Sequence, residues 1–327
     1  TERKCSTFCV QSIDIGPVQM HQLNKTLKEA GFENIFTEIN HTESLGLKNP
    51  HQLRMFHLDI ENNTFSFDAL HNFLLKNIGR YVFSRAKMEQ FHLEDDLETV
   101  GAKAIGLVKK ACNMDQDWIG EELGDIMLYA FLEQILSAPK LFSKIELTQF
   151  GSQHTKNGGG VHLLPLGNIG PTPSYQMIFG KSNVIGDLQD AIDNAFDHIL
   201  AVKNNVSNEL KIVESTVFSQ VYDAQTTDFL KEIIIPSKKK NAIVDKAFGV
   251  FLGYSLGLDP NNYSTAAFRA EFTKKMDTDI KAHVAYIADK IKAENLGTHS
   301  FYFYILPFND ADKEKKSIMN TVLGGGF

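Results

Sequence analysis

The sequence predicts an α/β fold in which helices flank a mixed β-sheet. Short segments typical of strands alternate along the chain with longer segments of helical period. No Pro/Ser-rich break and no internal repeat interrupts this alternation over the 327 residues. We therefore expect one domain, 1–327, in which an N-terminal portion (1–113), a core (114–205) and a C-terminal portion (206–327) share one sheet.

The expected elements of the N-terminal portion follow from local composition and period. A segment rich in β-formers, 5–15, ends at Gly16-Pro17 and predicts a strand that leads into a helix over 18–30. The segment LRMFHLDIENNTFSF, 53–67, alternates in polarity and predicts a strand with one apolar face. Apolar residues at helical spacing predict helices at 67–78 and 96–112.

The core begins with a long amphipathic helix over 117–136. After it we expect a strand at PKLFSKIEL, 139–147, and a Gly-rich turn. Two more strands, 161–166 and 175–180, are separated by GNIGPTPS, which has the composition of a turn. The next helix begins at Asp187, which is suited to cap its N-terminus.

The C-terminal portion continues the alternation of helices and strands. Its expected helices are 207–220, 265–293 and one from about 309, and its expected strands are EIIIP (232–236), AFGVFLGYSLGL (247–258) and HSFYFYILPF (299–308). The aromatic run Phe301 to Tyr304 is typical of core rather than of a base-stacking platform, since successive strand residues point to opposite faces.

Composition indicates a soluble globular protein that does not bind nucleic acid strongly without a partner. Hydrophobic residues make up 43% and charged residues 22% of the chain. The net charge is −7, whereas proteins that bind nucleic acid alone usually carry a basic surface. The lysine clusters at 109–110, 238–240 and 313–316 are each more typical of solvated faces. We expect a partner to deliver any nucleic-acid substrate.

The sequence also indicates a cytoplasmic location and no membrane association. No apolar run reaches the roughly 18 residues that span a bilayer. The first residues, TERKCSTFC, lack the apolar core of a signal peptide. The three cysteines, Cys5, Cys9 and Cys112, have neither a disulfide nor a zinc-site spacing, so we expect them to be reduced and structural.

The order of polar residues in the core indicates one kind of chemistry. Metal-dependent cleavage of a phosphodiester needs two or three carboxylates to hold Mg²⁺ and a lysine to orient or activate water. An acidic helix followed by strands with polar ends is the order in which such nuclease cores present these groups. Here the helix supplies Glu121, Glu122 and Asp125, but the strand positions hold other residue types.

Five segments resemble the HamA family of the Hachiman anti-phage defence systems. They are GEELGDIMLYAFLE, PKLFSKIEL, GVHLL, FGKSNVIGDLQDAI and FYFYILPF, within roughly 115–320. The resemblance implies a nuclease-like DNA effector of the PD-(D/E)xK class with a restriction-endonuclease-like core. It also implies a HamB-like superfamily 2 helicase as the partner that delivers DNA, and Mg²⁺ as the cofactor if the site is active.

The resemblance assigns the site residue by residue. The helix acids of the family fall on Glu122 and Asp125, which become the candidate metal ligands. Gly159 stands where the family has a metal-binding Asp. The family's Gly-Glu-Ser-Lys falls on 180–183, so Lys181 replaces the carboxylate and Asn183 replaces the catalytic lysine. A lysine cation repels Mg²⁺ rather than binding it, so the conventional metal site is expected to be broken.

Two functions therefore stay open for the candidate site of Glu122, Asp125, Lys181 and Asn183. One is a metal-dependent DNA endonuclease with an altered site, in which Glu146 or Asp187 substitutes for a missing carboxylate. The other is a catalytically inactive adaptor that binds and restrains the helicase. An unrelated soluble α/β protein is a third reading of the same sequence.

Other motifs in the core are weaker. His154-Thr155-Lys156 begins like the HxK signature of phospholipase D, but Val161 stands at the position of its Asp. The glycines 158–160 lack the Gly-Lys-Ser/Thr helix start of a P-loop. His162 could act as a ligand or a general base, but a packed strand histidine is the more common role.

Overall fold

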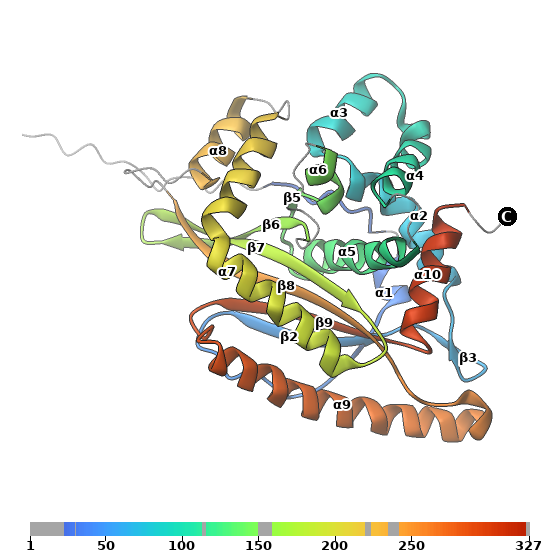
Figure 1. The fold of residues 1–327 in the computed structure, drawn as a ribbon. Helices are drawn as coiled ribbons and strands as arrows, with labels where there is room; N and C mark the ends of the chain where they lie inside the picture. The colour runs from blue at the N-terminus through green and yellow to red at the C-terminus, as the bar shows by residue number, and fades with distance from the viewer. Residues whose placement is uncertain are drawn as a thin grey trace, which may run out of the picture.

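A seven-stranded mixed sheet forms the centre of the protein, with helices against both faces (Figure 1). The computed structural model describes residues 23–29, 31–112, 116–149, 159–219, 224–234 and 242–324. The order of the strands across the sheet is β1-β2-β9-β8-β7-β6-β5. This architecture confirms the predicted α/β class.

The strands of the sheet are β1 (Thr37–Ile39), β2 (His51–His57), β5 (Lys140–Phe142), β6 (Val161–Ile169), β7 (Thr172–Val184), β8 (Ile243–Ser255) and β9 (Ser300–Phe308). A separate hairpin pairs β3 (Ile60–Glu61) with β4 (Thr64–Phe65). The helices are α1 (Phe32–Ile35), α2 (Asp68–Val82), α3 (Arg85–Leu93), α4 (Val100–Ala111), α5 (Gln116–Gln134), α6 (Lys144–Gln149), α7 (Leu188–Ser219), α8 (Ala224–Ile234), α9 (Thr265–Ala293) and α10 (Ala311–Val322).

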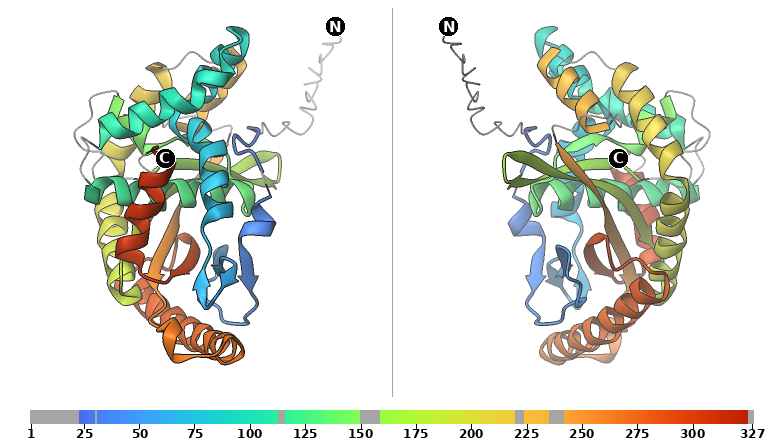
Figure 2. Two further views of the ribbon diagram at one scale, coloured as in Figure 1. Left: turned by 90° about the vertical axis from the view of Figure 1, so that its right-hand side faces the viewer. Right: turned by 90° about the vertical axis from the view of Figure 1, so that its left-hand side faces the viewer.

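The four central strands, β2, β9, β8 and β7, are parallel, and the outer pairs are antiparallel. Helices cover both faces of β9, and neighbouring residues show which helix lies where. The ring of Phe303 packs on Phe196 of α7, whereas that of Tyr304 packs on Phe131 of α5. All nine residues of β9 are buried, as expected for a strand covered on both faces. Figure 2 shows the sheet between these layers from two sides.

Most expected elements are confirmed, and several agree closely in their bounds. The helix over 265–293 matches α9, and the aromatic strand matches β9. The long core helix is α5, whose predicted stripe is buried at Leu123, Ile126, Met127 and Ala130. Asp187 caps α7, since its Oδ1 accepts hydrogen bonds from the backbone N–H of Gln189 at 2.8 Å and Asp190 at 3.0 Å.

The predicted strand over 139–147 is wrong beyond Phe142. Helix α6 begins at Lys144 because Ser143 and Glu146 form a capping box. The backbone N–H of Glu146 donates to Ser143 Oγ at 3.2 Å, and that of Ser143 donates to Glu146 Oε2 at 2.5 Å. Glu146 therefore lies on a helix and not on a strand.

Other boundaries also differ from prediction. The helices expected from 187 and at 207–220 are one helix, α7. The expected strand at 232–236 is wrong, because α8 runs to Ile234; 235–236 lie outside the described residues. Helix α3, capped by Ser84, was not predicted. Strands β6 and β7 extend through most of GNIGPTPS, and the left-handed Gly170 makes the turn between them.

The predicted strand 5–15 lies outside the described residues, as does much of the helix expected over 18–30. The residues of that range which are described, 23–29, are not helical. None of the helices in the described ranges combines the length and apolarity needed to cross a bilayer.

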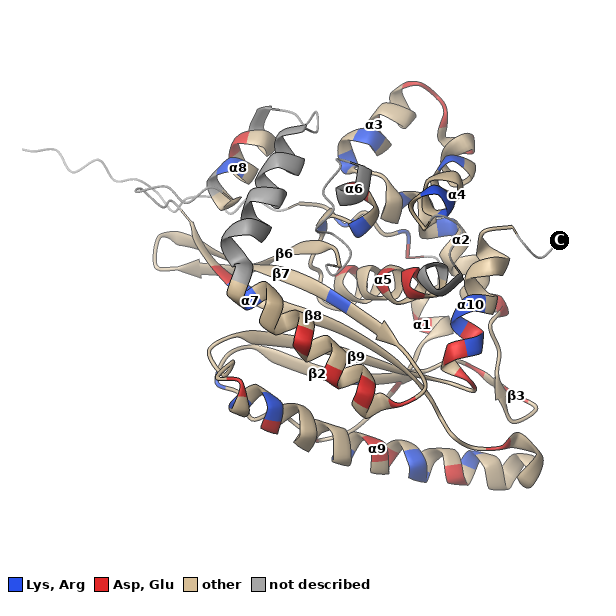
Figure 3. Cartoon of the chain, viewed as in Figure 1, with Lys and Arg blue, Asp and Glu red and all other residues tan. Residues whose placement is uncertain are grey.

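Charges of both signs mix on the exposed helices (Figure 3). On α9, Lys274 pairs with Glu271 and Lys281 with Asp277. On α10, Lys313 pairs with Asp310 at 2.6 Å. Such pairs stabilise the fold by little, but they offset the positive charge locally. The lysine cluster at 238–240 lies outside the described residues.

Candidate functional site

The two helix acids predicted from the sequence lie together under the sheet. Glu122 and Asp125 are one turn apart on α5, the helix that packs along β7 and β8. Their exposed fractions are 0% and 7%, so neither carboxylate is solvated to any extent. Buried carboxylates require a cation or several hydrogen bonds, and the groups that supply them define the site.

Lys144 is the cation that serves both carboxylates. Its Nζ lies 3.3 Å from Glu122 Oε1 and 3.2 Å from Asp125 Oδ2. The capping box of α6 fixes Lys144 at the first position of that helix. Burial alone would lower the pKa of Lys144, but the charges of Asp125 and Glu122 outweigh it and raise this pKa. The lysine is therefore an ammonium ion held between two acids.

Two hydroxyl groups complete the contacts of the carboxylates. Ser182 of β7 donates from Oγ to Asp125 Oδ1 at 2.5 Å, and Tyr81 of α2 donates from its OH to Glu122 Oε2 at 3.0 Å. Burial, together with the nearby charge of Glu122, raises the pKa of Tyr81 well above its ordinary value, so this group stays protonated. Burial also raises the pKa of Glu122, an effect that Lys144 partly offsets.

Lys181 and Asn183 lie beside the acids but on the other face of β7. Successive strand residues alternate in direction, and Ser182 is the one that contacts α5. A Cβ on Gly124 of α5 would lie 2.8 Å from Ser182 Cβ, which shows how closely the two elements approach. Lys181, Ser182 and Asn183 all line a small cavity of about 60 Å³ together with Asp125.

Gly159 approaches β7 too closely to hold a side chain there. Its N–H donates to the carbonyl oxygen of Gly180 at 3.0 Å, and the N–H of Gly180 donates to Gly160 at 2.9 Å. A Cβ on Gly159 would lie 2.5 Å from that Gly180 oxygen, a backbone atom that cannot turn aside. The position that the resemblance gives to a metal-binding Asp therefore admits only glycine on this backbone.

The substitute carboxylates are also engaged elsewhere. Glu146 Oε2 accepts from Lys140 Nζ at 2.9 Å and from the N–H of Ser143, and Asp187 caps α7. Within the described ranges, no group of three or more His, Cys, Asp and Glu side chains could hold a metal ion. Mg²⁺ prefers several oxygen ligands, whereas here two carboxylates enclose an ammonium. As arranged, these residues do not fit Mg²⁺.

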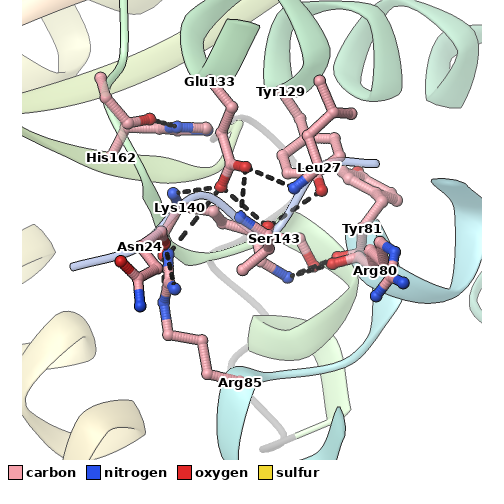
Figure 4. Close-up of polar contacts among 12 residues, drawn as sticks. Asn24, Leu27, Arg80, Tyr81, Arg85, Tyr129, Glu133, Lys140, Ser143 and His162 are labelled. Atoms are coloured by element: carbon pink, nitrogen blue, oxygen red, sulfur yellow. Dashed lines mark hydrogen bonds and ion pairs between the residues drawn. The ribbon is translucent and has the colours of Figure 1, made fainter. Parts of the chain in front are cut away.

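A second buried polar cluster lies further along α5, around Glu133 (Figure 4). Its carboxylate accepts from the backbone N–H groups of Thr26 and Leu27, both at 2.6 Å, and of Lys140 at 2.7 Å. The Thr26 hydroxyl donates to it as well, at 2.8 Å. Glu133 thus holds the segment 23–29 against α5, although Glu133 follows Thr26 by more than 100 residues in the sequence.

Lys140 and His162, which flank Glu133, serve structure rather than chemistry. The ammonium of Lys140 donates to the carbonyls of Arg80, Tyr81 and Phe83 at the end of α2, as well as to Glu146. His162 donates from Nδ1 to the carbonyl of Ala138 at 2.8 Å, and burial lowers its pKa to about 4. The histidine is neutral, buried and packed, as expected of a strand histidine.

Comparison with known protein families gives a match that covers most of the chain. The family described as HamA matches residues 33–322, nearly the whole chain. The chain belongs to the HamA family. This membership confirms the resemblance drawn from the sequence and indicates a role in anti-phage defence. No curated protein and no solved structure matches this HamA chain.

The sequence indicated two members of this buried cluster in the HamA protein. Glu122 and Asp125 were predicted to lie together, and they do. The residues that were missed are Lys144, Ser182 and Tyr81, which contact them. A signal for Lys144 was present, since Ser143-Lys-Ile-Glu146 is a capping-box sequence that starts a helix. Nothing in the sequence indicated Tyr81, which lies about 40 residues upstream.

Proposed function

We propose that this HamA protein acts in anti-phage defence as a non-cleaving subunit that binds and restrains a HamB-type helicase. The helicase brings the DNA, and the HamA fold supplies a surface for both. Family membership supports the defence role and the helicase partner. The net charge of −7 supports delivery of DNA by a partner, because the chain has no overall attraction for phosphates.

One observation carries the non-cleaving part of the proposal: the ammonium of Lys144 lies between Glu122 and Asp125. It satisfies both carboxylates at 3.3 and 3.2 Å, so a divalent ion would have to displace a cation that is part of the chain. Removing a paired buried lysine from its acids is costly. Lys181, nearby on β7, would add repulsion to any bound metal.

The alternative is an endonuclease with an altered site, and incubation with a plasmid separates the two functions. The purified chain, alone and with its helicase, is mixed with supercoiled plasmid, ATP and Mg²⁺. We expect no more degradation than with the double variant Glu122→Gln/Asp125→Asn. Asp190→Asn, an exposed acid on α7, is the matched control. Mg²⁺-dependent degradation that the double variant abolishes, and the control keeps, would establish the nuclease.

Two further measurements test the adaptor role directly. Titration calorimetry with Mg²⁺ and Mn²⁺ is expected to give no binding heat with the native chain. Size-exclusion chromatography is expected to show a stable complex with the helicase encoded beside it, and the ATPase rate of that helicase is expected to fall in the complex. Failure to form the complex, or an unchanged ATPase rate, overturns the adaptor role.

A further inference from the structure

Two leucines are exposed on the loop that joins α3 to α4, which we call the α3–α4 loop (93–99). Leu93 is the last residue of α3, and Leu97 is the first residue of a short 3₁₀ helix, η1 (Leu97–Thr99). Their exposed fractions are 77% and 47%, and Leu93 is the most exposed large apolar residue in the described part of the chain. Single exposed leucines are common, whereas two on one short loop offer apolar surface that burial against a partner would stabilise.

The α3–α4 loop is held in one shape by its own contacts. The carboxylate of Asp96 accepts from Thr99 Oγ1 at 2.6 Å and pairs with the ammonium of Lys103 on α4. The N–H of Asp96 donates to the carbonyl of Phe91 at 2.9 Å. Phe91 is buried, and its ring centroid lies 5.0 Å from that of Phe83. A loop fixed in this way loses little conformational entropy when a partner binds it.

Three carboxylates without a counterion accompany the leucines on this loop. Glu94, Asp95 and Glu98 are exposed, and none of them forms an ion pair with a residue that the structure describes. Glu94 accepts a hydrogen bond from the neutral amide of Gln90 at 2.6 Å, which leaves its charge in place. The loop is seen in red at the top of Figure 3, between α3 and α4. It thus combines apolar surface with negative charge.

This combination favours one class of partner. Carboxylates repel the phosphates of DNA, and the same repulsion acts against the anionic surface of a membrane. A second copy of the chain is disfavoured as well, because each copy carries a net charge of −7. A protein surface with an apolar pocket and a rim of lysine and arginine satisfies both parts of the loop. The loop lies at the end of α3 and α4 that projects away from the sheet, where a partner has access to it (Figure 1).

We propose that the α3–α4 loop docks this HamA protein onto its helicase. Leu93 and Leu97 enter an apolar pocket of the helicase. Lysine or arginine side chains at the rim of that pocket face the carboxylates of Glu94, Asp95 and Glu98. The inference rests on the proposed function, since it assigns the contact through which the adaptor holds the helicase. This docking surface is separate from the buried acids on α5.

Surface plasmon resonance tests the proposal, with the helicase encoded beside it immobilised and the full chain in solution. Leu93→Ala/Leu97→Ala is expected to raise Kd about thirtyfold, because two side chains lose the burial that the pocket supplies. Leu166→Ala, on β6 with an exposed fraction of 42%, is the matched control and is expected to leave Kd unchanged. All three leucines are exposed, so the melting temperatures of the variants are expected to equal that of the native chain.

The carboxylates are tested by the association rate. Glu94→Gln/Glu98→Gln is expected to slow association about threefold at low salt, because attraction between complementary charges is lost. The association rate of this variant is also expected to depend less on salt. Asp190→Asn/Asp289→Asn, which removes two exposed acids from α7 and α9, is the control and is expected to change the rate little. This comparison decides the outcome if the leucine variant has a lower melting temperature than the native chain.

The proposal is overturned if Leu93→Ala/Leu97→Ala binds as tightly as the native chain, if Leu166→Ala loses as much affinity, or if Glu94→Gln/Glu98→Gln associates at the native rate. A dimer of the chain alone that requires the leucines would identify a second copy as the occupant and overturn it too. If the native chain forms no complex with the helicase, the adaptor role is rejected and the docking loop with it. If the leucine variant forms the complex equally well, only the docking loop is rejected.

Discussion

The carbonyl oxygen of Gly180 accepts the N–H of Gly159 at 3.0 Å and occupies the space that a side chain on Gly159 would need. The contact brings the residues that precede β6 against β7 at the point where the cavity begins. It also means that the backbone around Gly159 leaves no room for a carboxylate side chain at this position. Substituting single residues is therefore not expected to create a metal site here.

Gly159→Asp is expected to destabilise the protein by about 2 kcal/mol, because the new Cβ collides with a backbone oxygen. It is not expected to create Mg²⁺ binding, even when combined with Lys181→Glu and Asn183→Lys. Urea unfolding measures the first effect and calorimetry the second. Gly106→Asp, at an open position of α4, is the control and should cost less. Tight Mg²⁺ binding by the triple variant would contradict the expectation.

Lys144→Met is expected to lower the free energy of unfolding by about 3 to 5 kcal/mol, because it leaves two buried carboxylates without their cation. Thermal or urea unfolding at pH 7 measures the loss. Lys281→Met removes an exposed pair with Asp277 and should cost under about 1 kcal/mol. Adding Glu122→Gln and Asp125→Asn to Lys144→Met is expected to recover much of the stability.

The destabilisation caused by Lys144→Met is expected to depend on pH. Without Lys144, the buried carboxylate of Glu122, whose pKa burial already raises, loses the charge that partly offsets this effect, so the folded variant binds a proton more readily than the unfolded chain. The stability gap between Lys144→Met and the native chain is therefore expected to narrow as the pH falls from 7 to 5. A gap that stays constant over this range would contradict the role given to Lys144.

His162 is expected to make the protein less stable in mild acid. Its pKa is about 4 in the fold, against about 6.5 when unfolded, so between these values only the unfolded state takes up the proton. The stability from this group is present at pH 7 and falls by up to about 3 kcal/mol as the pH approaches 4. The free energy of unfolding is measured against pH for His162→Asn and, as a control, for His92→Asn at an exposed position. Only His162→Asn is expected to make this free energy less dependent on pH.

Glu133→Gln is expected to loosen the segment 23–29 and to destabilise the fold by about 2 kcal/mol, because an amide NH₂ replaces one acceptor oxygen among several donors. Hydrogen exchange at the amides of Thr26 and Leu27 should speed up well before global unfolding. Glu33→Gln, an exposed acid that accepts a hydrogen bond from Gln134 at 3.3 Å, is the control. Unchanged exchange at Thr26 would show that Glu133 does not hold the segment.

The sequence was sufficient to predict elements with a long or unmistakable period. The 29 residues of α9 and the buried β9 agree with prediction because packing and local propensity favour the same structure. The wrong predictions fall on segments where packing and local propensity favour different structures. EIIIP has the composition of a strand, but its residues 232–234 belong to α8, on which Leu230, Ile233 and Ile234 are buried, and 235–236 lie outside the described residues. A short apolar run does not by itself distinguish a strand from a buried segment of helix.

The site was predictable only where its residues share an element. Glu122 and Asp125 follow from the period of one helix, whereas Tyr81, Lys144 and Ser182 arrive from three other elements. Strand alternation places Lys181 and Ser182 on opposite faces, but which of them faces α5 depends on how β7 packs on that helix, and a motif comparison does not include this packing. The short distance between Gly159 and Gly180 depends on the positions of backbone atoms, so it cannot be predicted from a pattern of residue types.

The place of β9 in the sheet has a consequence for how the chain is made. This strand, residues 300–308, separates β2 from β8, although β2 leaves the ribosome about 250 residues earlier. β1 can pair with one edge of β2 early, but the other edge of β2 has no strand to pair with until synthesis is nearly finished. We expect the nascent chain to expose the apolar face of β2 throughout translation, and so to depend on chaperones or on its partner more than a chain with sequential strand order would.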